Sequence, residues 1–133
     1  MLSTVNSSAV SANLVFAWLW ILLGFLSGMV MGLKFQDPNW LGGYSSFKRR
    51  MHRLAHISFF GLGTVNLFFY LSVRDATLSQ SGVLASRAFI PGGIAMPICC
   101  WLMAWRPKTQ PFFAIPVISL VSAAVLTLAQ LML

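Results

Sequence analysis

Long stretches without any acidic or basic side chain dominate this sequence and limit what it can fold into. The clearest is 54–73, twenty residues with no Lys, Arg, Asp or Glu. An α-helix rises 1.5 Å per residue, so about 20 residues cross the roughly 30 Å hydrocarbon core of a bilayer. Comparable runs occupy 14–33, 54–73, 88–105 and 112–133. The sequence therefore predicts an all-α integral membrane protein, in which four transmembrane helices form one up-down bundle and a single domain over 1–133.

Composition and charge exclude two other classes of protein. Hydrophobic residues make up 58% of the chain and charged residues only 8%, with a mean hydropathy of +0.80. A soluble domain with this composition would have too little polar surface. The formal net charge of +7 comes from nine basic residues that all lie between the apolar runs. We interpret them as topology signals and contacts for lipid headgroups, and we exclude nucleic acid as a partner.

The start of the chain has two interpretations. An uncharged leader, 1–13, precedes the first apolar run, so a cleaved signal peptide is the alternative to a retained helix. The leader has no Lys or Arg, the run is long for a signal peptide, and no clear A-x-A site follows it. We therefore expect the first helix to be retained.

Proline and glycine predict irregularity in the later runs. The third run contains Pro91-Gly92-Gly93 and Pro97, so we expect a helix that is kinked or partly unwound there. Trp101 and Trp105 near its end are typical of the aromatic belt at a membrane interface. Pro116 predicts a bend in the fourth helix.

The basic residues are distributed unevenly over the three connections. The second connection holds only Arg74 and Arg87. The first and third together hold Lys34, Lys48, Arg49, Arg50, Arg53, Arg106 and Lys108. The positive-inside rule then places connections one and three in the cytoplasm and both termini outside. We expect the membrane to be a bacterial inner membrane.

Two helices carry residues suited to close packing. In the first run, Gly24, Gly28 and Gly32 recur every four residues, a spacing that lets another helix backbone approach closely. In the second run, Gly63 and Asn66 lie on one stripe with His56. An amide or imidazole at membrane depth is costly without a partner, so this stripe should face the bundle interior or a cofactor.

Three interpretations of His56 stay open. In the first, a neighbouring carbonyl or hydroxyl binds the imidazole, and the Met and Cys side chains are ordinary packing. In the second, His56 is an axial ligand of haem b, with Met103 or a residue of a partner subunit opposite and the basic cluster near the propionates. In the third, the imidazole and the sulfur atoms of Met96, Cys99 or Cys100, and Met103 hold Cu(I).

His52 does not supply a second haem ligand in this chain. It lies four residues before His56 on the same helix face, whereas two axial histidines come from facing helices. It also adjoins the basic cluster, so we expect an exposed imidazole at the level of the lipid headgroups.

The segment SFKRRMHRLAHISFFGLG, 46–63, follows a glycine-rich first run. Together they resemble the start of catalytic subunit I in haem-copper oxidases and their nitric oxide reductase relatives. In that family an early histidine followed by an apolar, glycine-containing stretch ligates the low-spin haem, so the resemblance implies an axial-ligand role for His56. It covers only the first two runs. The chain lacks the family's later histidines, so the resemblance implies proximity to haem and no oxidase activity.

Few residues could support catalysis. The only acids, Asp37 and Asp75, lie in connections, which leaves no carboxylate inside the membrane for proton relay or cation coupling. We interpret the chain as a small accessory or structural subunit that packs against a larger integral membrane complex, with a respiratory or photosynthetic electron-transfer complex as the first candidate. The alternative is a small membrane cytochrome, associated with haem b or quinone, that uses His56. A third class, an assembly or insertion factor, would associate only transiently.

Overall fold

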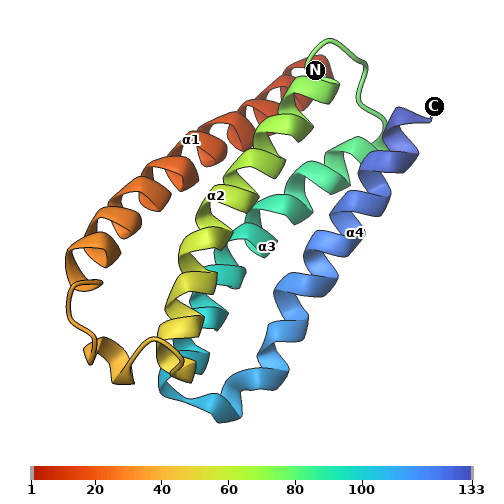
Figure 1. Ribbon diagram of the computed structural model, residues 1–133. Helices are drawn as coiled ribbons and strands as arrows, with labels where there is room; N and C mark the ends of the chain where they lie inside the picture. Colours follow the sequence, from red (N-terminus) through yellow and green to blue (C-terminus); the bar gives the residue numbers. More distant parts are fainter. Residues whose placement is uncertain (1, 133) are drawn as a thin grey trace.

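Four long helices form the fold (Figure 1). The computed structural model describes the backbone of residues 2–132 and the side chains of residues 10–132. The long helices are α1 (Leu2–Lys34), α2 (Phe47–Val73), α3 (Gln80–Trp105) and α4 (Ala114–Leu131), with short 3-10 helices η1 (Trp40–Gly42) and η2 (Pro107–Phe113). Successive long helices run in opposite directions, which confirms the predicted all-α, up-down bundle.

The helices have the length and composition of membrane spans. The four spans are Val10–Lys34, Phe47–Val73, Gln80–Trp105 and Pro107–Leu131. Most of their large apolar side chains point outward, as expected for a bundle surrounded by lipid. The chain is therefore an integral membrane protein. Connections one and three lie together at one end of the bundle, and both termini lie at the other end with the α2–α3 turn (Figure 1).

Three helices begin earlier than the apolar runs predict, so the predicted starting residues are wrong. α1 begins at Leu2 instead of residue 14, α2 at Phe47 instead of 54, and α3 at Gln80 instead of 88. Hydropathy marks the part of a helix that lies in hydrocarbon, whereas a helix can continue into the polar interface. In α2 this extra part begins at an N-cap, where the Ser46 hydroxyl accepts the Arg49 N–H at 3.2 Å.

The fourth helix is shorter than predicted. α4 covers Ala114–Leu131 instead of 112–133, and residue 133 lies outside the described residues. Pro116 lies in the first turn of α4, where its missing N–H would have had no partner within the helix. Pro116 therefore fits near the start of α4 without the loss of a helical hydrogen bond.

α3 is the helix that contacts the other three. It presents glycines to its neighbours: a Cβ built on Gly92 would lie 2.9 Å from Leu120 of α4, and one on Gly93 would lie 2.7 Å from Phe16 of α1. These distances are shorter than van der Waals contact, so a side chain at either position would displace the Leu120 or Phe16 side chain or separate the helices. The small residues of α3 therefore set how closely α1 and α4 approach.

α3 is helical throughout Gln80–Trp105, so the prediction that its prolines partly unwind it is wrong. The helix does change direction along its length (Figure 1). Proline has no N–H, so Pro97 leaves the carbonyl of Gly93 without its helical partner. The indole N–H of Trp20 in α1 donates to this carbonyl at 3.0 Å. A neighbouring helix thus satisfies the carbonyl that the proline frees.

Two polar side chains of α4, Ser119 and Gln130, attach it to the rest of the bundle. The Ser119 hydroxyl donates to the carbonyl of Ala88 in α3 at 2.8 Å. At the other end of α4, Gln130 Oε1 accepts from the Ser79 N–H at 2.8 Å, while its Nε2 donates to the Thr77 carbonyl at 3.3 Å. These bonds fix both the depth and the rotation of α4, whose outer face is exposed and apolar.

The contact between α1 and α2 can be tested with two glycines of α2. A Cβ on Gly63 would lie 3.0 Å from the Ala17 carbonyl oxygen of α1, whereas one on Gly61 would have no atom within 4 Å. We expect Gly63→Leu to lower the free energy of unfolding by about 1–3 kcal/mol, because a backbone atom cannot move aside easily. Gly61→Leu is the matched control and should leave the melting temperature in detergent unchanged or raise it. Equal melting temperatures for the two variants would contradict this packing.

Candidate functional site

A buried polar network joins α1, α2 and α3. Asn13 Nδ2 donates to Asn66 Oδ1 at 2.8 Å and to the Ser86 carbonyl at 3.3 Å. The Ser86 hydroxyl donates to Asn13 Oδ1, and Asn66 Nδ2 donates to the Leu62 carbonyl at 2.9 Å. All three side chains are at most 1% exposed. Because both amides have protein partners, the network is suited to holding three helices in register.

His56 lies between α2 and α1. Its Nδ1 is 2.8 Å from the Ser27 hydroxyl, which also donates to the Gly24 carbonyl at 3.0 Å. A hydroxyl has one proton, so both contacts are satisfied when His56 Nδ1 carries a hydrogen and Nε2 has the lone pair. A Cβ on Gly28 would lie 2.9 Å from His56 Cε1, so the glycine makes room for the imidazole. The edge of the ring also meets Phe60, with centroids 5.4 Å apart.

Met103 lies in different surroundings from His56. It is half-buried in a groove of about 540 Å³ that it shares with Met51, Leu54 and Pro111. His56 packs on α1, against Ser27 and Gly28.

The other sulfur residues differ in burial. Met31 is buried in α1, while Met29 is 60% exposed. Cys99 and Cys100 are both buried free thiols in α3, and Cys99 Sγ is 3.7 Å from the Phe112 carbonyl. In the part of the chain that the structure describes, no group of three or more His, Cys, Asp or Glu residues could hold a metal ion.

The predicted packing glycines have different surroundings. Gly24 meets Phe60 of α2, at 2.9 Å from a built Cβ, and Gly28 meets His56. Gly63 meets the backbone of α1 at Ala17. Gly32, the last glycine of the strip, has no atom within 4 Å of a built Cβ. Gly24 and Gly28 therefore pack within this chain, between α1 and α2.

A cluster of cations and aromatic rings surrounds the start of α2. Arg49 is only 4% exposed, and its guanidinium carbon lies 5.0 Å from the ring centroid of Phe35, 5.5 Å from that of Trp40 and 5.6 Å from that of Tyr44. Such cation–π contacts gain strength when water is excluded. Connection one therefore folds around Arg49.

Further contacts extend this cluster to the end of α3. Arg53 lies 4.5 Å from the Tyr44 ring, and Lys48 Nζ lies 4.8 Å from the Trp105 ring. The His52 ring is half-buried, with its centroid 6.3 Å from that of Trp40 and 6.2 Å from that of Trp105. His52 was expected to be exposed, and the structure shows it half-buried between these two rings. We call these residues the cation–aromatic belt: Phe35, Trp40, Tyr44, Lys48, Arg49, His52, Arg53 and Trp105.

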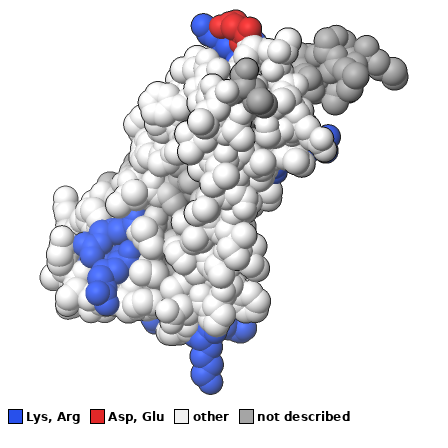
Figure 2. Space-filling view, turned by 90° about the vertical axis from the view of Figure 1, so that its right-hand side faces the viewer, with Lys and Arg blue, Asp and Glu red and all other residues white. Residues whose placement is uncertain are grey.

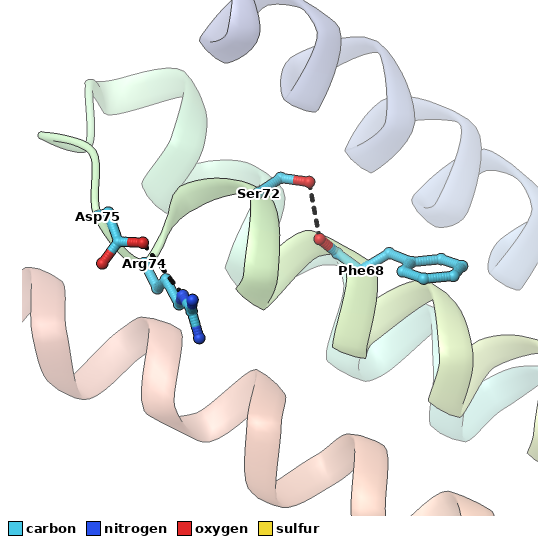
Figure 3. Close-up of polar contacts among 4 residues, drawn as sticks. All are labelled: Phe68, Ser72, Arg74 and Asp75. Atoms are coloured by element: carbon cyan, nitrogen blue, oxygen red, sulfur yellow. Dashed lines mark hydrogen bonds and ion pairs between the residues drawn. The ribbon is translucent and has the colours of Figure 1, made fainter.

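The polar contacts of Ser72 and Arg74, at the opposite end of α2, are local (Figure 3). Ser72 donates to the Phe68 carbonyl of the preceding turn at 2.8 Å, and Arg74 Nε lies 3.1 Å from Asp75 Oδ2. This is the only ion pair within residues 10–132, and both side chains are at least half exposed. An exposed pair of this kind contributes little to stability.

Sequence reasoning missed Asn13, Ser86 and Arg49. A signal for Asn13 exists, because it continues the spacing of three to four residues through Ala17, Trp20 and Gly24 along one face of α1. Arg49 had no comparable signal, because the aromatic rings around it come together only when connection one folds.

Comparison of the chain with protein-family models, with curated proteins and with solved structures found no match.

Proposed function

We propose that this chain is a small, non-catalytic membrane subunit that packs against a larger integral membrane complex. The observation that carries the proposal is that the polar side chains inside the spans already bind one another. Asn13 binds Asn66, Ser27 binds His56, and Gln130 binds Ser79. Polar groups used in this way fix helix packing. An electron-transfer complex, respiratory or photosynthetic, is the first candidate, because His56 resembles a haem ligand in its sequence context.

The outward faces of α1 and α4 are the surfaces available to such a complex. On α1, Trp18 is 61% exposed and Phe25 is 64% exposed. On α4, Ile118 is 65% exposed and Val125 is 59% exposed. Large aromatic and branched side chains of this kind suit van der Waals packing against another helix.

Photo-crosslinking tests the proposed association. We expect a photoreactive residue at Phe25 or at Val125 to form an adduct with one membrane polypeptide in native membranes, and that polypeptide to copurify in stoichiometric amount. A photoreactive residue at Asp75, which is 87% exposed on the α2–α3 turn, is the control and should give no such adduct. Lipid adducts alone at both helix positions, with a chain that purifies by itself, would contradict the proposal. A substoichiometric, transient adduct would indicate an assembly factor instead.

The second candidate is a membrane cytochrome that binds haem b or quinone. One observation favours it: Ser27 binds Nδ1 of His56, which leaves Nε2 as the ring nitrogen with a lone pair. Metal-ligating histidines have this arrangement, in which the other ring N–H donates to a protein oxygen. A haem would also need an opposing ligand, which Met103 or a partner subunit would supply.

Two matched variants distinguish the candidates. Ser27→Ala and His56→Ala both remove the same hydrogen bond, so we expect both to lower the free energy of unfolding by about 1 kcal/mol. If His56 has only a structural role, we expect the protein purified gently with its partners to show no Soret band that depends on His56. A b-type band that is lost in His56→Ala and retained in Ser27→Ala would contradict the structural role and establish the cytochrome.

We also propose an orientation in a bacterial inner membrane, with connections one and three cytoplasmic and both termini outside. The proposal rests on the seven basic residues of those two connections against two in the α2–α3 turn.

Cysteine labelling tests this orientation. Ala76 in the α2–α3 turn and Ser45 in connection one are both exposed, whereas the native Cys99 and Cys100 are buried. We expect Ala76→Cys to react with a membrane-impermeant maleimide in intact cells, and Ser45→Cys to react only after permeabilisation. The reverse pattern would show that the orientation is inverted.

A further inference from the structure

We propose that the end of the bundle formed by connections one and three binds the phosphate headgroup of an anionic phospholipid. The site is a cavity of about 630 Å³ between the first turn of α2 and the last turn of α3. Ser46, Lys48 and Trp105 line this cavity, and the cation–aromatic belt continues from them. The proposal goes beyond a packing role, because it assigns a ligand and a site for it.

Charge at this end is uncompensated by the protein. Seven Lys and Arg residues belong to connections one and three, against a single carboxylate, Asp37. Asp37 Oδ1 accepts the N–H of Asn39 at 2.9 Å, and none of these cations forms an ion pair within the described side chains. Figure 2 shows blue Lys and Arg side chains at the lower end of the molecule with no red beside them in this view, whereas the red patch at the upper end adjoins blue. Such an excess of cations at a membrane interface attracts anionic headgroups.

Arg49 provides a second, independent observation. Its side chain is 4% exposed, and its Nε has no hydrogen-bond partner in the part of the chain described. Aromatic faces supply partial negative charge but do not accept a full complement of hydrogen bonds from a guanidinium. Arg49 does not line the cavity, but it follows Lys48, which does. A buried cation without a counter-charge is costly, so an anion bound at the rim would offset part of this cost by charge attraction without contacting Nε.

The walls of the cavity favour a lipid over a free anion. Lys48 and the N-terminal end of the α2 dipole supply positive potential at the rim. Leu41, Phe47 and Pro107 add apolar surface, and the Trp105 ring lies under the Lys48 ammonium. A phosphate diester that carries a glycerol and acyl chains matches this combination of a charged rim and an apolar wall.

Lipid binding by the full chain, measured by native mass spectrometry from detergent, tests the proposal. The probes are phosphatidylglycerol, phosphatidylcholine and inorganic phosphate. We expect phosphatidylglycerol to bind about tenfold more tightly than phosphatidylcholine. Lys48→Gln, at an exposed position, should weaken phosphatidylglycerol binding about fivefold, which is the contribution of one basic residue near an anionic surface.

Arg74→Gln is the matched control, because Arg74 is exposed at the opposite end of α2. We expect this variant to bind phosphatidylglycerol as the unchanged protein does. Equal affinities for the two phospholipids, or equal effects of the two variants, would overturn the proposal. Binding of inorganic phosphate as tight as that of phosphatidylglycerol would show a free-anion site and would also overturn it. None of these outcomes depends on whether the chain packs against a larger complex.

Discussion

The hydrogen bonds among Asn13, Asn66 and Ser86 are the constraint on which the other helix contacts depend. An amide in hydrocarbon must find a partner, and these partners come from α1, α2 and α3. The bonds therefore fix the depth of the three helices relative to one another. With that register, the backbone of α1 at Ala17 meets Gly63, and Ser27 reaches His56.

α3 links α1 and α2 to α4. Its glycines allow close approach on two sides, and its proline at position 97 exposes a carbonyl that Trp20 of α1 satisfies. α4 then depends on α3 and on the turn before it, through Ser119 and Gln130. A central helix that is rich in glycine and proline is stable here because its neighbours complete its hydrogen bonding.

The four helices and their antiparallel order could be predicted from the sequence, because uncharged runs of about 20 residues have few alternatives. The helix ends could not, since α2 starts with cations that hydropathy assigns to a loop. The inward stripe of Gly63 and Asn66 was visible from spacing, but the partner Asn13 lay in a segment that we read as a leader. The group of aromatic rings around Arg49 could not be predicted either. It depends on positive φ at Leu41, Gly42 and Gly43, which turns the connection back so that Trp40 and Tyr44 face Arg49.

The central claim is that polar side chains within the spans serve to hold the helices together. A double-mutant cycle tests it most directly, with Asn13→Leu, Asn66→Leu and the double variant compared by equilibrium unfolding in detergent. Each single variant leaves one buried amide without its partner, while the double variant removes both. We predict that the double variant is less destabilised than the sum of the singles, by about 0.6–1.7 kcal/mol. Strictly additive effects would contradict the claim that this pair couples α1 to α2.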